Sequence, residues 1–353
     1  MHKTAVVFSP IYYRHDPGKS HPESARRLHA IVRELKKGEV TAQKNWKIVK
    51  PENASIDDVE LVHGIEYIRL VEAVCRSGGG LLDLEDTIVS PESYRVALHA
   101  VGGALKAVKL VLKGYFQNAF ALVRPPGHHA SKYRACGFCL FNNVAIVAKY
   151  LIEKCKVERV LILDVDAHHG NGTQEIFFDT NKVLYVSLHE DPYGFPGTGF
   201  AGEVGEGEGE GYNVNVPLPF MTADDMYLRA MKEIVEPIVL QYDPQFVLVS
   251  AGFDGHLSDP VGNLSLSESC YQKVFGSIVD LASKTACDRL VSVLEGGYNV
   301  RFLGKNAAIA LAVMSSTSCK IHSKFRKSSR GVRKRGEKVI EEVRKLHKKY
   351  WDL

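Results

Sequence analysis

The chain has 353 residues and a formal net charge of +4, and hydrophobic residues make up 45% of it. A chain of this size and balance can bury a large core in one α/β domain. No apolar run approaches the ~20 residues that span a bilayer, and the apolar run after Met1 is too short for a secretory signal peptide. Seven cysteines form an odd set without a paired framework, which argues against a disulfide scaffold and predicts a cytoplasmic protein.

Strand-like apolar runs alternate with helical patterns along the chain. The apolar runs lie near residues 3–9, 119–124, 159–165, 182–188, 245–250 and 289–294, and the helical patterns near 23–37, 91–113, 140–156, 224–241 and 267–284. Such alternation predicts a parallel sheet covered by helices on both faces. We therefore expect residues 1–353 to form a single α/β domain with three layers, α/β/α, and a central, mainly parallel sheet. Residues 202–211 interrupt the pattern, and their glycines and glutamates predict a mobile surface loop that does not pack.

The run that ends near residue 165 leads into acidic and histidine side chains, in Leu161-Ile-Leu-Asp-Val-Asp-Ala-His-His-Gly170. Alternate residues of an extended chain share a face, so Asp164, Asp166 and His168 would point the same way. Carboxylate and imidazole ligands suit zinc, and a catalytic zinc site typically has three protein ligands and an open position. Taken alone, this pattern is equally typical of residues that cap the next helix.

Three further strand-like runs also end in polar motifs. They are Arg124-Pro-Pro-Gly-His-His129, Val247-Leu-Val-Ser-Ala-Gly-Phe-Asp254 and Leu294-Glu-Gly-Gly-Tyr-Asn299. Ligands and catalytic groups gather where the carboxyl ends of parallel strands meet, so four such motifs predict one shared pocket.

These motifs resemble the histone deacetylase family, which lies within the arginase-like deacetylase superfamily. The resemblance spans nearly the whole chain and implies an arginase/deacetylase-like fold. Glu295-Gly-Gly-Tyr298 and Asn171 resemble the class II branch found in bacteria and archaea. The other matching segments are His21-Pro-Glu23 with Arg27, Gly137-Phe-Cys-Leu-Phe-Asn-Asn143, Phe195-Pro-Gly-Thr-Gly199, Asn213-Val-Asn-Val-Pro217 and Tyr350-Trp351.

The resemblance implies that Asp166, His168 and Asp254 are the metal ligands. Zinc is the expected ion, with ferrous iron as the alternative. Such an ion polarises a substrate carbonyl and makes water acidic enough to attack it. A structural potassium ion is also implied, and its ligands would be Asp164, Ser187 and the backbone carbonyls of Asp166, His168 and Leu188, with a second such site near Phe177, Val183 and Tyr212.

The resemblance also gives catalytic roles to His128, His129 and Tyr298. His129 is the expected general base, which later protonates the leaving amine, whereas His128 acts chiefly through its charge. Asp164 and Asn171 are expected to orient His128 and His129 respectively. A carboxylate favours a charged imidazole and an amide does not, so we expect His129 to stay neutral more readily. The phenol of Tyr298 would donate a hydrogen bond to the developing oxyanion.

A narrow channel is the expected route to this site. By resemblance Phe138 and Phe195 flank the channel, and Gly137 and Gly296 line it. Asp86 at the rim would hold the substrate backbone, although its spacing from Asp83 departs from the family pattern. A channel of this kind suits a long aliphatic stem that ends in an amide, as in acyl-lysine.

We therefore expect a zinc-dependent amidohydrolase that removes acetyl or other acyl groups from lysine side chains of a protein or peptide. The alternative enzyme is an acetylpolyamine amidohydrolase, which would need an acidic residue at the channel mouth, where Val261 is apolar. A non-catalytic acyl-lysine binding module ranks lower, because His129, Tyr298 and three ligands are intact. An arginase-like ureohydrolase also ranks low, since Asn171 stands where a further carboxylate would be needed. The sequence leaves the oligomeric state open.

Cys136 and Cys139 form a CxxC pair. Half a zinc site, a redox pair and simple packing are three interpretations of it. A structural zinc site would need a second pair, which the chain lacks. Packing is therefore favoured, with a regulatory thiol pair as the alternative.

Residues 320–335 hold eight Lys and Arg and no Asp or Glu. An exposed connector is favoured for this segment, with weak contact to nucleic acid as the alternative. The helical spacing that follows predicts a helix over residues 337–351 that docks on the body of the domain. Its apolar positions are Val339, Ile340, Val343, Leu346 and Tyr350.

Overall fold

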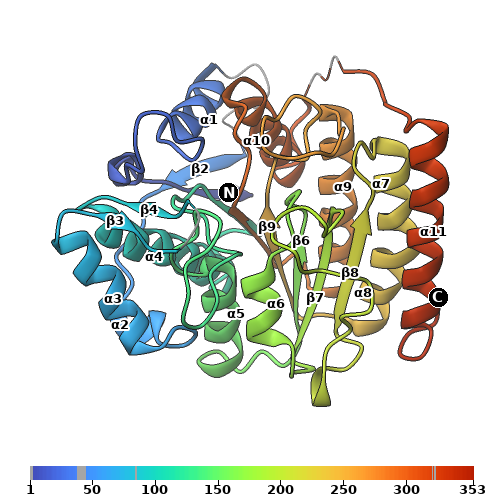
Figure 1. Ribbon diagram of the computed structural model, residues 1–353, viewed down its shortest axis with the longest axis horizontal. Helices are drawn as coiled ribbons and strands as arrows, with labels where there is room; N and C mark the ends of the chain where they lie inside the picture. Colours follow the sequence, from blue (N-terminus) through green and yellow to red (C-terminus); the bar gives the residue numbers. More distant parts are fainter. Residues whose placement is uncertain (1–2, 38–44, 84–85, 320, 322) are drawn as a thin grey trace.

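The computed structural model describes residues 3–37, 45–83, 86–319, 321 and 323–353 of the chain. Its centre is an eight-stranded sheet of order β2-β1-β5-β10-β9-β6-β7-β8, in which every neighbouring pair is parallel (Figure 1). These strands are β1 (Thr4–Val7), β2 (Trp46–Val49), β5 (Asn118–Ala121), β6 (Val160–Asp164), β7 (Val183–Glu190), β8 (Asn213–Leu218), β9 (Phe246–Ala251) and β10 (Leu290–Leu294). A small antiparallel pair is formed by β3 (Gly80–Leu81) and β4 (Ile88–Val89).

Helices cover both faces of the large sheet (Figure 1). On one side α4 packs against β1, β5 and β10, and α5 packs against β6 and β9, whereas on the other side α10 packs against both α1 and α9. The α-helices are α1 (Arg26–Lys37), α2 (Ile56–Val59), α3 (Ile65–Arg76), α4 (Ser93–Leu112), α5 (Asn143–Glu153), α6 (Asn171–Phe177), α7 (Asp224–Ala230), α8 (Glu236–Tyr242), α9 (Glu268–Thr285), α10 (Val300–Met314) and α11 (Arg330–His347). Short 3-10 helices η1 (Pro10–Arg14) and η2 (Gly207–Gly209) and a π-helical turn η3 (Met231–Val235) complete the described elements.

The predicted class and layering are confirmed. Each of the six apolar runs overlaps a strand of the sheet, and each predicted helical pattern overlaps a helix, with η3 joining α7 to α8 inside residues 224–241. The central strands read as continuous apolar runs because both their faces are buried; every residue of β6, β7 and β9 is buried.

The two edge strands β2 and β8, the short pair β3 and β4, and the helices α2, α3, α6 and α10 were not predicted from the sequence. Edge strands lack a continuous apolar run, since Lys47 and Ile48 of β2 are exposed and Asn213 and Asn215 alternate with valines in β8. A pattern that relies on apolar continuity therefore finds the middle of the sheet and overlooks its margins.

The prediction that residues 202–211 do not pack is wrong. A Cβ on Gly211 would lie 2.5 Å from the ring of Tyr350, so the loop contacts the end of the chain. The Glu203 carboxylate accepts hydrogen bonds from Nε2 of Gln174 at 2.6 Å and from the backbone N–H of Gly199 at 3.0 Å. Glycine at these positions permits close approach of the backbone rather than exposure.

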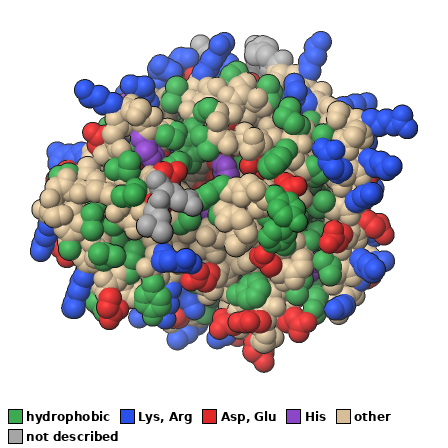
Figure 2. All heavy atoms as spheres, in the orientation of Figure 1, with side chains coloured by type: hydrophobic (Ala, Val, Ile, Leu, Met, Phe, Trp, Pro, Cys, Tyr) green, Lys and Arg blue, Asp and Glu red, His purple; other side chains and the backbone are tan. Residues whose placement is uncertain are grey.

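The helix α11 begins at Arg330, so the last six residues of the segment 320–335 are helical and not part of a connector. Two residues of that segment, 320 and 322, lie outside the described residues. The side chain of Ser329 caps the helix by accepting the N–H of Val332, and the helix packs against β8 and α7. Lys and Arg side chains are spread around the outline of the molecule in Figure 2, including the side where α11 lies. Within the described parts of the chain, no helix is long and apolar enough to cross a membrane.

Candidate active site

The four strands that end in polar motifs are neighbours in the middle of the sheet. Strands β5, β10, β9 and β6 run in the same direction, so their carboxyl ends meet at one edge. Asp164 at the end of β6 pairs with Ser250 of β9, whose next residue, Ala251, pairs with Leu294 at the end of β10. The register therefore brings the motifs that follow these strands to one place.

Asp166, His168 and Asp254 form a buried cluster at this edge. One ligand atom from each lies within 4.8 Å of the other two. Nδ1 of His168 lies 3.2 Å from Oδ1 of Asp166 and 3.2 Å from Oδ2 of Asp254. The same ring nitrogen thus faces both carboxylates, as a shared ion would require.

The electrostatics of this cluster fit a divalent cation. Burial raises the pKa of Asp254 to about 7, and the negative charge of Asp166 adds to the effect. Burial alone would also raise the pKa of Asp166, but the charge of His128 and the hydrogen bond from His168 lower it below its usual range. A cation would relieve the repulsion between the two carboxylates, and two carboxylate oxygens with one imidazole nitrogen are a donor set that zinc accepts.

Two glycines leave room for the carboxylates of the cluster. A Cβ on Gly252 would lie 2.1 Å from Oδ2 of Asp166, and a Cβ on Gly296 would lie 2.0 Å from Oδ2 of Asp254. The backbone N–H of Gly296 also donates to Oδ2 of Asp166 at 2.8 Å, and that of Ala167 donates to Oδ1 of Asp254 at 2.8 Å. The residues present therefore fit a bound metal ion and hold its ligands in place.

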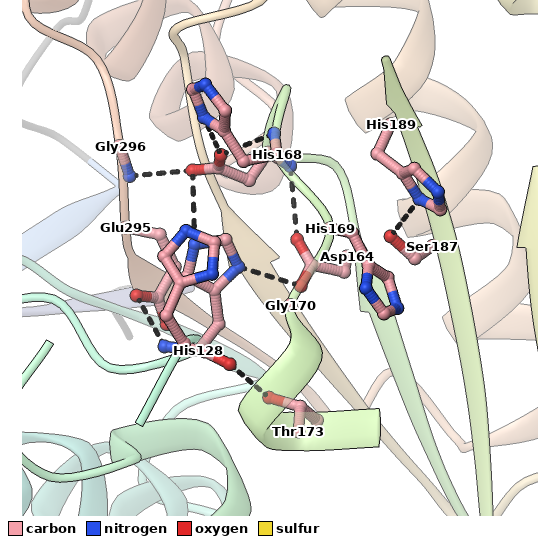
Figure 3. A network of polar contacts seen from close by, with 12 residues as sticks. His128, Asp164, His168, His169, Gly170, Thr173, Ser187, His189, Glu295 and Gly296 are labelled. Atoms are coloured by element: carbon pink, nitrogen blue, oxygen red, sulfur yellow. Dashed lines mark hydrogen bonds and ion pairs between the residues drawn. The ribbon is translucent and has the colours of Figure 1, made fainter. Parts of the chain in front are cut away.

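His128 and His129 follow β5, and the centroids of their rings are 3.9 Å apart. Nδ1 of His128 lies 3.0 Å from Oδ2 of Asp164, a contact drawn in Figure 3. Nδ1 of His129 lies 2.8 Å from Oδ1 of Asn171. Each imidazole is thus held by the partner that sequence reasoning assigned to it.

These two partners give the imidazoles opposite charge states. Burial lowers the pKa of His128, but the charges of Asp164 and Asp166 outweigh burial and raise the pKa to about 10. Burial lowers the pKa of His129 well below its usual range, and the charge of His128 lowers it further. These opposite shifts favour a charged His128 and a neutral His129, which is the difference expected from a carboxylate and an amide partner.

Tyr298 lies half-buried on the loop that follows β10. The guanidinium carbon of Arg27 lies 4.9 Å from the centre of its ring, and the ring of Phe138 meets it edge-on at 5.6 Å. Burial raises the pKa of Tyr298 well above its usual range, so the phenol keeps its proton and can donate a hydrogen bond.

An aromatic ring and the backbone of a glycine lie next to the imidazole of His129. The ring of Phe195 lies 5.0 Å from that of His129 and 6.0 Å from that of His168. Gly137 has φ +52, and a Cβ there would lie 2.5 Å from Cδ2 of His129. The next residue, Phe138, is also left-handed, with φ +68. The turn at 137–138 therefore places Gly137 and Phe138, two of the predicted channel residues, beside the site.

The predicted rim residues lie nearby, with different environments. The carbonyl oxygen of Asp86 lies 3.1 Å from Nε2 of His21, whose ring meets that of Phe138 at 4.6 Å. Val261 is half-buried on the loop after β9, and its backbone N–H donates to Oδ1 of Asp259 at 3.1 Å. Both positions remain predictions for substrate contact.

The predicted potassium ligands lie on β6, β7 and the segment after β6. Asp164 and Ser187 are register partners, and the Ser187 hydroxyl lies 2.8 Å from Nδ1 of His189 (Figure 3). The Asp164 carboxylate also accepts the hydroxyl of Tyr185 at 3.1 Å, and the carbonyl of Leu188 accepts that of Tyr227 at 3.4 Å. Potassium binding by these groups remains a prediction.

The role of Glu295, which lies in the motif Glu295-Gly-Gly-Tyr298, was not predicted from the sequence. Its Oε2 accepts the backbone N–H of Gly127 at 2.6 Å and that of His128 at 3.2 Å, so it joins the loop after β10 to the loop after β5. Its carbonyl oxygen accepts a hydrogen bond from Arg27, as does that of Gly297 at 2.6 Å. Only its place inside a polar strand-end motif pointed to Glu295.

A buried ion-pair network supports both loops from behind. Glu23 pairs with Nη1 of Arg27 at 3.0 Å and with Nε of Arg124 at 2.5 Å, and all three side chains are fully buried. The two guanidiniums hold the pKa of the Glu23 carboxyl well below its usual range, against the effect of burial. Breaking such a network would leave an uncompensated buried charge, so it fixes the loops firmly.

His128, Cys139 and Glu295 form a second compact group with metal-ligand chemistry. The Cys139 thiol is fully buried and donates to the carbonyl of Gly137 at 3.4 Å, and burial raises its pKa well above its usual range. A protonated thiol is a poor metal ligand. Cys136 and Cys139 pair across the turn at 137–138 without a disulfide, and all seven cysteines are free thiols.

The chain is similar to proteins that are named as deacetylases. Residues 21–314 match the family model described as "Histone deacetylase domain". A protein of Archaeoglobus fulgidus named "Probable deacetylase" is 40% identical, over 99% of this chain and 98% of that protein. The "Histone deacetylase-like amidohydrolase" of Pseudomonas aeruginosa is 38% identical, over 80% of this chain and 73% of that protein. The crystal structure of the HDA15 HD domain matches with a TM-score of 0.88 and 32% identity, covering 99% of this chain and 95% of that one.

The fold and the buried polar site define a hydrolase of the arginase/deacetylase fold, with a group of side chains able to hold a metal ion. The chain belongs to the histone deacetylase family. Members of this family are generally metal dependent and act on acylated substrates, and the relatives above are named as a probable deacetylase and a deacetylase-like amidohydrolase.

Proposed function

We propose that the chain is a zinc-dependent lysine deacylase, which hydrolyses acetyl or related acyl groups from lysine side chains of a protein or peptide. The observation that supports this proposal is a buried cluster of two carboxylates and one imidazole, Asp166, His168 and Asp254, whose His168 ring lies 6.3 Å from that of His129. Zinc bound there would supply a Lewis acid for the substrate carbonyl and for water. Seven free cysteines support residence in a reducing compartment such as the cytoplasm.

The protein side chains then handle the protons. Nδ1 of His129 donates to Oδ1 of Asn171, so the other ring nitrogen can accept a proton from water and later pass it to the leaving amine. The charged imidazole of His128, held by Asp164, stabilises negative charge that develops next to it. Tyr298 donates its phenolic hydrogen to the oxyanion, and its high pKa keeps that hydrogen in place.

The surroundings of the site favour an acyl-lysine over an acetylpolyamine. The aromatic rings of Phe138 and Phe195 suit an aliphatic stem, and neither carries charge to meet a second ammonium. Val261 is apolar, and the nearby carboxylate of Asp259 already accepts three backbone N–H groups. Neither Val261 nor Asp259 therefore provides a free carboxylate, which the second ammonium of a polyamine would need.

Ligand substitution combined with a substrate panel tests the proposal. Asp166→Ala, His168→Ala and Asp254→Ala should each lose bound metal and activity while keeping much of the fold. The wild type should turn over acetyl-lysine or longer acyl-lysine peptides faster than acetylpolyamines, and elemental analysis should find zinc rather than iron. Retention of metal and full turnover in all three variants would disprove the ligand set, and a preference for acetylspermidine would replace the lysine assignment.

A further inference from the structure

The Asp259 carboxylate joins two loops of the candidate site. Its Oδ1 accepts the backbone N–H of Val261 at 3.1 Å. Val261 lies on the loop that follows Asp254, one of the candidate metal ligands. Its Oδ2 accepts the N–H of Tyr298 at 2.7 Å and that of Asn299 at 2.9 Å, on the loop after β10. One side chain therefore accepts three backbone N–H groups, on two loops, that no helix or strand hydrogen bond satisfies.

Several backbone groups of the loop after β10 are held by side chains from elsewhere in the chain. Arg27 binds the carbonyls of Glu295 and Gly297, and Asp166 binds the N–H of Gly296. Asp259 binds the N–H of Tyr298 itself. Arg27 belongs to the buried ion-pair network and Asp166 to the metal cluster, so Asp259 is the anchor of this loop that can be changed while both of those remain.

A carboxylate suits this position because the three groups that hydrogen-bond to its side chain are all N–H donors. An ionised carboxylate presents acceptors on both oxygens, whereas an amide presents an acceptor on one side and an NH₂ donor on the other. With asparagine, either the N–H of Val261 or the N–H pair of Tyr298 and Asn299 would face a donor. Asparagine therefore keeps the size of the side chain and weakens its hold on the loop.

We propose that Asp259 is a positioning residue for the reaction, which holds the Tyr298 backbone so that the phenol meets the oxyanion. The inference rests on the proposed function for its kinetic consequence, because Tyr298 is there the oxyanion donor. A donor of this kind is effective only when preorganised, and a displacement of about 1 Å can cost about 100-fold in rate. Asp259 itself needs no contact with substrate.

The kinetic test is a double-mutant cycle on the intact chain. In Asp259→Asn, kcat for an acetyl-lysine peptide should fall about tenfold or more, with KM changed by less than about twofold and bound zinc retained. In the Tyr298→Phe background the same substitution should change kcat by less than about twofold, because the phenol it positions is gone. An equal loss in both backgrounds would overturn the proposal, since it would show that Asp259 acts by some route other than Tyr298.

The matched control is Asp224→Asn. Asp224 is fully buried whereas Asp259 is half-buried, but it too is a carboxylate that accepts backbone N–H groups, from Ser267 at 2.9 Å and Arg326 at 2.8 Å, and neither donor lies on the loop after β10. Asp224→Asn is expected to lower thermal stability without a comparable loss of kcat. If it lowered kcat as much as Asp259→Asn does, loss of a capping carboxylate in general would explain the effect and the positioning role would fail.

Hydrogen exchange separates this inference from the proposed function. The amides of Tyr298 and Asn299 should exchange at least about tenfold faster in Asp259→Asn than in the wild type, a measurement that needs no substrate. If the wild type turned over no acyl-lysine while these amides lost protection, the proposed function would fail and the anchoring role would stand. Unchanged exchange at both amides would overturn the anchoring role whatever the activity.

Discussion

The sharpest test of the metal cluster is the addition of one methyl group at Gly296. A Cβ there would lie 2.0 Å from Oδ2 of Asp254 and 2.5 Å from Oδ2 of Asp166. The backbone cannot retreat freely, because the N–H of Gly296 donates to Asp166 and its carbonyl accepts the N–H of Phe253 at 3.2 Å. Since ordinary contact begins near 3.4 Å, the Asp254 oxygen would have to move by about 1.4 Å.

A shift of that size should disable the site more than it destabilises the fold. Displacing a reacting or binding group by about 1 Å costs about 100-fold, so kcat/KM in Gly296→Ala should fall at least about 100-fold, with weaker zinc binding. Overpacking of this kind costs about 1–3 kcal/mol of stability. The assay compares zinc content after dialysis, turnover of an acetyl-lysine peptide and thermal unfolding.

The control for this prediction is Gly276→Ala on α9, where an added Cβ meets no atom within 4 Å. Replacing a glycine inside a helix by alanine should stabilise the protein by about 0.5–1 kcal/mol and leave zinc and turnover unchanged. If Gly296→Ala retained zinc and turned over substrate within threefold of the wild type, the two carboxylates would not be the ligands that the geometry indicates.

Three further predictions address the oxyanion, the substrate and pH. Tyr298→Phe should lower kcat at least about 100-fold with little change in KM, and an unchanged kcat would remove the phenol from the mechanism. Val261→Glu should raise the turnover of acetylpolyamines relative to acetyl-lysine peptides, because it would place a carboxylate where a distal ammonium can pair; a ratio unchanged from the wild type, measured on both substrates, would refute this. Burial lowers the pKa of His63 to about 4, and its neutral ring bridges the carbonyl of Ser131 and the N–H of Asn142. As pH falls, the unfolded chain takes up a proton on His63 before the folded chain does. The free energy of unfolding should therefore decrease by about 3 kcal/mol between about pH 6.5 and pH 4. Denaturant unfolding across this range should show a correspondingly smaller pH dependence in His63→Gln, and an identical dependence would contradict the assignment.

The amino-acid sequence by itself determined the middle of the sheet and the composition of the site. Strands β6, β7 and β9 are buried on both faces, so their sequences are apolar runs that can be recognised without a structure. The polar residues that follow β5, β6, β9 and β10 stand out against those runs. Because the carboxyl ends of parallel strands converge, the pocket they share could be predicted before its geometry was known.

Only the tertiary structure decided how the site is held together. Arg27 binds the carbonyl of Gly297 across 270 positions of sequence, Glu295 binds the N–H of Gly127 across 168, and Asp259 binds the N–H of Tyr298 across 39. In each case a side chain meets a backbone group, and every residue other than proline offers the same N–H and carbonyl. A backbone partner cannot be recognised in the sequence, because its residue type does not matter. The side chains that do chemistry are therefore visible in the sequence, whereas those that position them are recognised only when the folded chain brings them to the backbone they hold.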